Sequence, residues 1–229
     1  MIGVFDSGAG GINALREIRR LMPRTDAVYL ADRKNAPYGT KKKGELISLV
    51  TRDITRLCEM GIDKILIACC TASTVFDMLP DECRAVSTPI IGFAARAAAE
   101  ATRRGKIGVI ATDATVCSGA FSGAISSLSP DLSVTEVSAQ PLVGLVENGA
   151  RDGRVGEGER ETLSHILEKI KLERIDVLIL GCTHFSSLAG EISRTMGDGV
   201  TVIDAARVGA REFIKNIRDG GCGKITYTS

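Results

Sequence analysis

The sequence contains no tryptophan, few other aromatic residues and almost no net charge. Aromatic side chains occupy 4% of the 229 positions, and 29 basic residues offset 28 acidic ones to leave a formal charge of +1. Without an overall field, nothing steers nucleic acid or an anionic membrane toward the protein, so we expect neither as a partner. No apolar run approaches the roughly 18 residues that span a bilayer, and the first residues lack a signal-peptide pattern, which predicts a cytoplasmic protein.

Patterns typical of disulfide frameworks and zinc sites are missing as well. Seven cysteines are an odd number on a chain too long to need disulfide staples. None of them has the C-x-x-C spacing of a zinc site. The cysteine pattern therefore predicts reduced thiols and no metal.

Short apolar runs alternate with helical patterns along the whole chain. The runs are apolar throughout instead of alternating with polar residues, which is typical of parallel strands covered by helices on both faces. The 25 glycines suit the many tight turns of such a fold. This pattern predicts the α/β fold class, with strands at 2–5, 27–31, 64–68, 89–92, 107–111, 134–137, 177–180 and 200–203, and helices at 11–21, 43–60, 72–79, 94–104, 118–127, 158–171, 185–196 and 206–218.

No low-complexity linker divides the chain, so two domains would have to be joined by short crossings. We place these crossings near Phe93 and Asp204. The sequence thus predicts one domain from residues 1–92 and 204–229, and a second domain from residues 93–203.

One pattern occurs once in each half of the chain. Residues 66–73 and 178–185 both have the pattern of a buried strand that ends in a cysteine, continues with a threonine and opens into a helix. The first cysteine of each pattern is Cys69 or Cys182. The halves are therefore expected to be pseudo-symmetric copies, each a mostly parallel sheet flanked by helices.

Cys69 and Cys182 are predicted to lie at the carboxyl ends of strands, where α/β sheets bind their ligands. A helix N-terminus favours the thiolate, so we expect a lowered pKa for both thiols. Taken singly, such a cysteine is often only a small buried side chain. As a pair, the thiols could remove a proton from one face of a carbon and deliver one to the other face, which predicts a cofactor-independent racemase of a small amino acid.

The first predicted strand ends in Asp6-Ser7-Gly8-Ala9-Gly10-Gly11, which opens the first helix. Its backbone N–H groups and the Ser7 hydroxyl are suited to hold a substrate carboxylate. A nucleotide-binding loop is the alternative, but Asn13 stands at the position of the third glycine and no Gly-Lys-Ser/Thr is present. Asp6 is either a helix N-cap or a carboxylate that positions or tunes Cys69.

His184 is the better placed of the two histidines to protonate or orient a thiol, because it lies two residues after Cys182. His165 has the pattern of an ordinary helix residue. Residues Pro37-Tyr38-Gly39-Thr40 form a predicted turn that, together with Asp32, could close over a ligand.

Three further polar residues have weaker local support. Thr112 and Thr115 follow a predicted strand and are either helix caps or hydroxyl donors to a ligand. Glu147 has the least support, because a charged residue in a helix is normally solvated. The lysines at 41–43 are most simply a solvent-facing run.

Five ordered motifs resemble glutamate racemases, of the cofactor-independent aspartate/glutamate racemase superfamily. They run the length of the chain and are highly specific as a set. The motifs are Ile2-Gly-Val-Phe-Asp6-Ser7-Gly8, Asp32 followed by Pro37-Tyr38-Gly39-Thr40, Ala68-Cys69-Cys70-Thr71-Ala72-Ser73, Ile107-Gly-Val-Ile-Ala-Thr112 with Thr115, and Leu180-Gly181-Cys182-Thr183-His184.

The resemblance implies a homodimer of chains with two pseudo-symmetric domains, an active site in the cleft between them, and no cofactor, metal or nucleotide. It implies interconversion of L- and D-glutamate, which supplies D-glutamate for bacterial cell-wall peptidoglycan. It also implies that Cys69 and Cys182 are the acid/base groups, assisted by Asp6, His184 and Glu147. The residues that it assigns to substrate binding are Ser7, Pro37, Tyr38, Gly39, Cys70, Thr71, Thr112, Thr115 and Thr183.

The chain departs from the family pattern at four positions. Cys70 stands where an asparagine usually binds the amino-acid head group, and Arg33 stands where a threonine is common. Phe121 replaces a common tyrosine, and Ser186 replaces a usual proline. A racemase of aspartate or another acidic amino acid, a one-thiol relative that decarboxylates or isomerises an acid, and a non-catalytic amino-acid-binding relative remain as alternatives. Cys70 is also a candidate for a vicinal disulfide with Cys69, or for the reactive thiol itself.

Overall fold

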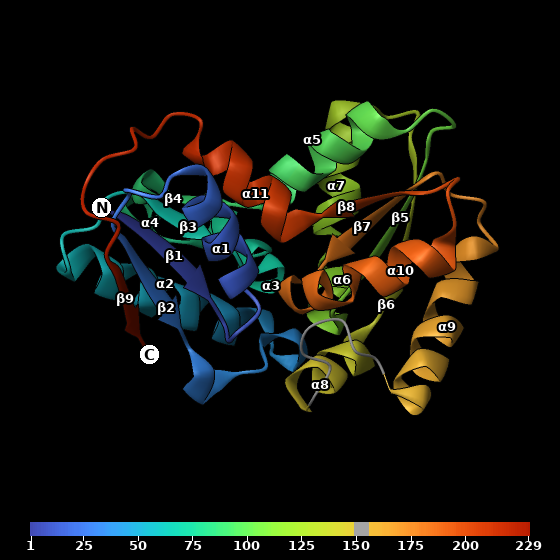
Figure 1. Ribbon diagram of the computed structural model, residues 1–229, viewed down its shortest axis with the longest axis horizontal. Coiled ribbons are helices and arrows are strands. Elements are labelled where there is room, and N and C mark those ends of the chain that lie inside the picture. Colours follow the sequence, from blue (N-terminus) through green and yellow to red (C-terminus); the bar gives the residue numbers. More distant parts are fainter. Residues whose placement is uncertain (149–155) are drawn as a thin grey trace. The chain divides into compact units, whose positions relative to one another are not determined.

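The computed structural model describes residues 1–148 and 156–229 and divides into two compact units (Figure 1). Unit 1 comprises Met1–Ile90 and Ala206–Ser229, and unit 2 comprises Ile91–Ala205. The units divide before residue 91 and after residue 205, each two residues from the predicted crossings before residue 93 and after residue 203. The first crossing comes earlier than expected because the helix that opens unit 2 already begins at Ile91.

Unit 1 is built on a five-stranded parallel sheet in the order β4-β3-β1-β2-β9. β1 (Ile2–Asp6) and β2 (Ala27–Ala31) are buried along their whole length, because helices cover both faces of the sheet. β3 (Ile65–Ile67) and β4 (Ser87–Pro89) are shorter. β9 (Ile225–Thr228) pairs with β2, so the last segment of the chain completes the sheet that the first segment begins.

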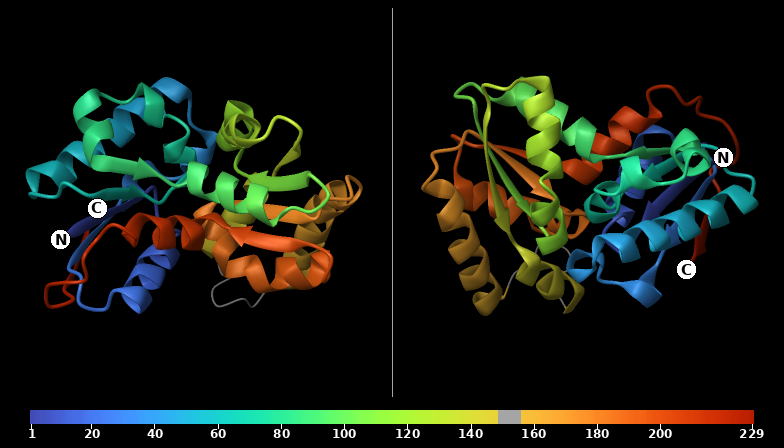
Figure 2. Two further views of the ribbon diagram at one scale, coloured as in Figure 1. Left: turned by 90° about the horizontal axis from the view of Figure 1, so that it is seen from above. Right: turned by 180° about the vertical axis from the view of Figure 1, so that it is seen from behind.

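The two long helices of unit 1, α1 (Ile12–Leu21) and α2 (Lys43–Glu59), lie on opposite faces of this sheet (Figure 1, Figure 2). α11 (Ala205–Ile214) joins α1 through an ion pair between Arg211 Nε and Glu17 Oε1, 2.7 Å apart. The short helical segments of unit 1 are η1 (Arg33–Asn35), η2 (Tyr38–Thr40), α3 (Cys70–Ser73), η3 (Phe76–Met78) and α4 (Asp81–Val86).

Unit 2 contains a four-stranded parallel sheet in the order β6-β5-β7-β8. The inner strands β5 (Lys106–Ala111) and β7 (Val177–Gly181) are buried except at Lys106. The outer strands β6 (Ser133–Ser138) and β8 (Thr201–Asp204) are only partly buried. The carboxyl ends of all four strands therefore lie along one edge of the sheet.

Helices cover both faces of the unit 2 sheet (Figure 2). α5 (Ile91–Ala101) and α7 (Ala120–Leu128) pack together on one face. α9 (Glu157–Lys171) and α10 (Ala189–Met196) cover the other face and bury an apolar cluster that includes Ile170, Leu178 and Ile192. The remaining segments are α6 (Asp113–Ser118), α8 (Gln140–Asn148) and η5 (Thr183–Leu188).

The predicted α/β fold class is confirmed, because both sheets are parallel and flanked by helices. The eight predicted strands correspond to β1–β8, but β4 ends at Pro89, where the predicted strand begins. Proline cannot donate to the next strand and therefore suits the end of an edge strand such as β4.

Two predicted helices are wrong in part. The helix predicted at 72–79 is divided into α3, which ends at Ser73, and η3, which starts at Phe76. The helix predicted at 185–196 becomes regular only at Ala189, because η5 precedes it. The sequence pattern did not predict α4, α6 or β9 and gave no bounds for α8, because these elements have four to nine residues each and so few periodic positions.

No helix within the described ranges, 1–148 and 156–229, is long and apolar enough to cross a membrane.

Candidate active-site residues in the two units

Cys69 lies two residues beyond the end of β3 and directly before α3. Its sulfur accepts a hydrogen bond from the backbone N–H of Ala72, 3.4 Å away, and thereby caps the helix. Ser7 Oγ also lies 3.4 Å from this sulfur. Cys69 is 5% exposed. The β3–α3 connection thus brings the buried thiol into contact with the loop that follows β1.

The loop after β1 is fixed from two sides. Asp6 Oδ1 accepts a hydrogen bond from the Gly8 N–H at 2.8 Å, and the Tyr29 hydroxyl donates to the Gly8 carbonyl at 2.7 Å. A Cβ on Gly11 would lie 2.5 Å from the Asp6 Cβ, so only glycine leaves room for this carboxylate. The alternative that Asp6 caps α1 is wrong, because the N-cap is Gly11 and has no side-chain hydrogen bond. Asp6 instead braces the turn that carries Ser7.

The electrostatic environment of Cys69 favours the neutral thiol. Its pKa is raised to about 11, first because the thiol is buried and second because the Asp6 carboxylate is close. Hydrogen bonds from Ser7 and the Ala72 N–H oppose these effects but do not outweigh them. The expected lowering of the pKa at a helix N-terminus is therefore wrong for Cys69, because α3 has only four residues and the loss of solvent is the larger effect.

Cys70 and Thr71 follow Cys69 in α3, and both are buried. None of the seven cysteines forms a disulfide, so the alternative of a disulfide between Cys69 and Cys70 is wrong. Ser73 ties the helix to neighbouring strands, because its hydroxyl donates to the Ile67 carbonyl at 3.2 Å and accepts from the Ile90 N–H at 3.3 Å. The turn after Cys69 is thus anchored to the sheet at its far end.

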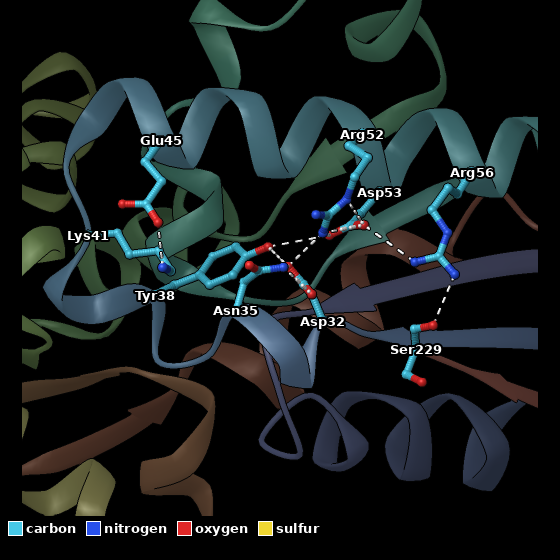
Figure 3. A network of polar contacts seen from close by, with 9 residues as sticks. All are labelled: Asp32, Asn35, Tyr38, Lys41, Glu45, Arg52, Asp53, Arg56 and Ser229. Carbon is cyan, nitrogen blue, oxygen red and sulfur yellow. Dashed lines mark hydrogen bonds and ion pairs between the residues drawn. The ribbon is translucent and has the colours of Figure 1, made fainter.

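The segment that contains Pro37, Tyr38 and Gly39 is joined to α2 by a network of polar groups (Figure 3). The Tyr38 hydroxyl donates to Asp32 Oδ2 at 2.7 Å, and Arg52 of α2 donates to the same oxygen at 2.7 Å. Tyr38 and Gly39 are buried, whereas Pro37 is exposed. The hydroxyl of Tyr38 is therefore committed to this network.

In unit 2, Cys182 directly follows β7, and its sulfur lies 3.6 Å from His184 Nδ1. The other ring nitrogen, His184 Nε2, lies 3.2 Å from Glu147 Oε1 of α8. That separation suits an ion pair with a protonated ring, although Nε2 has no aligned hydrogen-bond partner among the described residues. Cys182 and His184 are buried and Glu147 is exposed, so the three groups connect a buried thiol to a solvated carboxylate.

The residue before Cys182 has no room for a side chain. A Cβ on Gly181 would lie 2.9 Å from Phe121 Cε2 and 3.1 Å from the Ile110 carbonyl oxygen. Phe121, one of the departures from the family pattern, is fully buried and packs against the end of β7. Its phenyl ring thus serves to position the strand that carries Cys182.

The remaining predicted residues of unit 2 are buried in turns after β5 and β7. Thr112 caps α6, because its Oγ1 accepts from the Thr115 N–H at 3.4 Å, and the two hydroxyls lie 2.9 Å apart. Thr183 is buried at the start of η5. Ser186, also in η5, donates from Oγ to Asp204 Oδ1 at 2.9 Å and ties η5 to the end of β8.

Sequence reasoning missed Tyr29, Arg52 and Asp53, which brace the predicted residues of unit 1. Tyr29 stands in a fully buried strand, and a buried phenol needs a hydrogen-bond partner, so its pattern contained a usable signal. Asp53 lies three residues after Val50 and four before Leu57, on the buried face of α2. Its position in the helical period predicts a buried site, and an aspartate at a buried position is unusual.

Among the residues that the structure describes, no three histidine, cysteine, aspartate or glutamate side chains are grouped so that they could hold a metal ion.

Each of the two α/β units thus places a cysteine beyond the carboxyl end of an inner parallel strand, Cys69 after β3 and Cys182 after β7. The chain belongs to the Asp/Glu/hydantoin racemase family, whose model matches residues 13–213. The family membership that the five motifs predicted is therefore confirmed. A glutamate racemase from Desulforudis audaxviator is 39% identical over 214 residues, which make up 92% of this chain and 76% of that protein.

Solved structures give the same result. A glutamate racemase isoform from Bacillus anthracis superposes with a TM-score of 0.88 at 29% identity, over 99% of this chain and 86% of that one. The glutamate racemase from Thermus thermophilus, in complex with β-chloro-D-alanine, gives a TM-score of 0.84 at 31% identity with the same coverage.

Proposed function

We propose that the protein is an amino-acid racemase that interconverts L- and D-glutamate without a cofactor, through Cys69 and Cys182. One observation carries this proposal: each unit places a cysteine beyond the carboxyl end of an inner parallel strand, β3 or β7. Ligands of α/β sheets bind at such strand ends. The glutamate racemases of Desulforudis audaxviator and Bacillus anthracis support glutamate as the substrate.

In this mechanism, the thiolate of one cysteine removes the α-proton. An S–H bond forms, the C–H bond breaks, and the electron pair stays on the α-carbon. The thiol of the other cysteine then donates its proton to the opposite face and becomes a thiolate. The two cysteines exchange roles in the reverse direction. Because a carbanion beside a carboxylate is unstable in water, fixed hydrogen-bond donors must surround it.

The two thiols have different helpers in this proposal. Asp6 braces the Ser7 turn and raises the pKa of Cys69, so Cys69 is held as a proton donor. His184, 3.6 Å from Cys182, receives or returns the proton of that thiol, and Glu147 stabilises the charged imidazolium. In one direction Cys182 with its histidine is therefore the base and Cys69 the acid, and in the other direction these roles are exchanged.

We assign substrate binding to polar groups of the same turns. A carboxylate needs N–H and hydroxyl donors, which the Ser7 loop supplies, whereas the thiol of Cys70 is a weaker partner than an amide. The assigned residues are Ser7, Pro37, Tyr38, Gly39, Cys70 and Thr71 in unit 1, and Thr112, Thr115 and Thr183 in unit 2.

The family resemblance also supports a proposed cellular role, location and oligomeric state. The product D-glutamate supplies peptidoglycan synthesis, and the enzyme works in the cytoplasm as a homodimer. Sedimentation velocity of the purified chain tests the homodimer, since a single monomeric species would contradict it.

Hydrogen exchange in D₂O tests the reaction itself. Incubation with either L- or D-glutamate should place deuterium on the α-carbon and bring both enantiomers to a racemic mixture, followed by NMR and circular dichroism. Absence of exchange with both enantiomers would rule out racemisation of glutamate. Tight glutamate binding without exchange would identify an amino-acid-binding protein instead.

Serine substitutions test whether two thiols are needed. Cys69→Ser and Cys182→Ser should each lower the racemisation rate by at least about 10³-fold, because an alcohol is a far poorer acid and base than a thiol at neutral pH. Cys83→Ser, a buried thiol of unit 1, and Cys117→Ser, an exposed thiol of unit 2, are the matched controls and should stay active. Near-normal racemisation by either of the first two variants would point to a one-thiol enzyme.

Arg33 and Cys70 depart from the family pattern, so the same assay should include aspartate as an alternative acidic substrate. Arg33 is exposed on η1, and Cys70 is buried directly after Cys69. A faster turnover of L-aspartate than of L-glutamate would reassign the substrate while leaving the two-thiol chemistry in place.

A further inference from the structure

The segment between β2 and α2 carries three residues assigned to substrate binding, Pro37, Tyr38 and Gly39, but has neither a strand nor an α-helix of its own. Residues 32–42 contain only η1 and η2, which are single 3-10 turns. A segment of this kind is placed by its side-chain contacts. For Tyr38, the residue before Gly39, those contacts lead to Asp32 and to Asp53 of α2 (Figure 3).

Asp32 is the centre of these contacts. Its Oδ1 accepts from Asn35 Nδ2 at 2.8 Å, and its Oδ2 accepts from the Tyr38 hydroxyl and from Arg52 Nη2, both at 2.7 Å. Burial alone would raise the pKa of Asp32, but the hydrogen bonds from Tyr38, Asn35 and Arg52 outweigh it, so the pKa is lowered. An ionised Asp32 therefore closes the segment on itself and attaches it to α2.

Arg52 also holds a second carboxylate, that of Asp53. Its Nε donates to Asp53 Oδ1 and its Nη2 to Asp53 Oδ2, each at 2.9 Å, in a two-point geometry that a lysine cannot reproduce. Asp53 is fully buried, and its Oδ2 also lies 3.3 Å from the Tyr38 hydroxyl. The Arg52 guanidinium therefore bridges the carboxylates of Asp32 and Asp53, and both carboxylates also contact the Tyr38 hydroxyl.

This network lies next to the Cys69 turn. η2 packs against α3, the helix that Cys69 caps. The ring of Tyr38 lies 6.4 Å from the ring of Phe5, the residue before Asp6 in β1. A displacement of Tyr38 would therefore be transmitted to the groups that surround the thiol.

We propose that Arg52 and Asp53 of α2 are positioning residues, which hold Tyr38 and Gly39 beside the Cys69 turn by way of Asp32. This inference rests on the proposed function, because it assigns Tyr38 and Gly39 to substrate binding. Arg52 fixes the segment only while it neutralises both carboxylates. Without the guanidinium, two buried carboxylates that share one phenol repel each other, and the segment moves.

The charged and titratable groups around the pair come from several elements. Arg56 of α2 lies 3.7 Å from Asp53 and also donates to the Ser229 carbonyl at 3.0 Å. Cys69 is close enough for its charge to raise the pKa of Tyr38, after burial and the contact with Asp32. The full set is Asp32, Tyr38, Arg52, Asp53, Arg56 and Cys69, with the Lys41–Glu45 ion pair at the start of α2.

Arg52→Gln is the first test. We expect the KM for glutamate to rise by about tenfold at pH 8 with kcat changed less than about threefold, because the segment binds substrate but moves no proton. As the pH is lowered, one carboxylate of the pair takes up a proton and the repulsion ends, Asp53 first because burial already raises its pKa, so KM should return toward the wild-type value. The wild-type KM should show no such pH-dependent rise.

A second variant distinguishes positioning from a general loss of stability. Arg52→Gln combined with Asp53→Asn removes the repulsion together with the guanidinium, while the amide at position 53 keeps an oxygen that can accept from the Tyr38 hydroxyl. The KM at pH 8 should therefore recover to within about threefold of wild type. Arg52→Lys keeps the charge without the fork and should fall between wild type and Arg52→Gln. Arg194→Gln, which breaks an exposed ion pair with Glu191 on α10, is the matched control and should leave KM unchanged.

Hydrogen exchange measured by mass spectrometry makes the test independent of turnover. Peptides covering residues 33–42 should exchange faster in Arg52→Gln than in wild type at pH 8, and the double variant should restore protection. If wild type fails to racemise glutamate, the proposed function is wrong, and the exchange data still decide the positioning role. Unchanged KM and unchanged exchange in Arg52→Gln would overturn the inference.

Discussion

The sulfur of Cys69 lies between two hydrogen-bond donors and one carboxylate. Ser7 Oγ and the Ala72 N–H each lie 3.4 Å away and favour the thiolate. Burial and the charge of Asp6 favour the thiol and are the larger influences. Asp6 thus acts on Cys69 in two opposed ways, since its contact with the Gly8 N–H also braces the turn that carries Ser7.

The titration of Cys69 follows from these contacts. The rate of Cys69 alkylation by iodoacetamide should rise with pH along a titration curve whose midpoint is about 11. Only the thiolate reacts, and the pKa of the Cys69 thiol is raised to that value. Asp6→Asn removes a negative charge that disfavours the thiolate, so the midpoint should fall. Peptide-resolved mass spectrometry separates Cys69 from the other thiols. A wild-type midpoint at or below 9.0, the ordinary value, would contradict the burial argument.

Candidate site residues could be found from the sequence where a chemically reactive residue type stood at the predicted end of a strand. Cys69 and Cys182 end apolar runs, and His184 lies within reach of Cys182 because it follows two residues later. Tyr29 and Asp53 were missed because the groups that they position, the Gly8 carbonyl and the Tyr38 hydroxyl, lie 21 and 15 positions away in the chain. The Tyr29 hydroxyl of β2 donates to the Gly8 carbonyl in the loop after β1. Asp53 of α2 contacts the Tyr38 hydroxyl in the segment before that helix.

At the scale of elements, α11 depends on a close approach to Ile90 within unit 1. A Cβ on Gly209 would lie 2.5 Å from Ile90 Cγ2 and 2.8 Å from Ile90 Cβ. Ile90 is fully buried at the end of β4, so it has no free direction in which to move. The helix can therefore pack here only because position 209 lacks a side chain.

Gly209→Ala should destabilise the protein by about 2 kcal/mol, because the added methyl forces α11 away from Ile90. The matched control is Gly44→Ala in α2, where nothing lies within 4 Å of the added Cβ. That change should raise stability by about 0.5 kcal/mol, since alanine favours the helix. Urea denaturation followed by far-ultraviolet circular dichroism gives both values. Equal effects of the two substitutions would refute the close approach.

The strands with the clearest sequence signal are those that are buried along nearly their whole length. β1, β2, β5 and β7 are buried on both faces and therefore read as continuous apolar runs. β9 is only partly buried along its four residues, and nothing in that pattern separates it from a loop. It is placed by pairing with β2, nearly 200 positions earlier in the chain, which no local pattern encodes.

At the scale of the whole molecule, the chain crosses between the units twice and without a spacer. β4 ends at Pro89 and α5 begins at Ile91, while β8 ends at Asp204 and α11 begins at Ala205. Each unit holds one of the two thiols, Cys69 or Cys182. The two units are therefore joined by two short covalent crossings.

Mixing two inactive variants tests whether the thiols that serve one substrate belong to one chain. An equimolar mixture of Cys69→Ser and Cys182→Ser protein should racemise glutamate no faster than either variant alone, because every chain then lacks one partner thiol. Circular dichroism of glutamate provides the readout, and wild-type protein diluted equally with either variant is the control that should keep half its activity. Recovery of activity in the mixture, before or after joint refolding, would mean that one catalytic pair is formed by two chains. In that case the covalent crossings would hold the fold together but would not select the partner of each thiol.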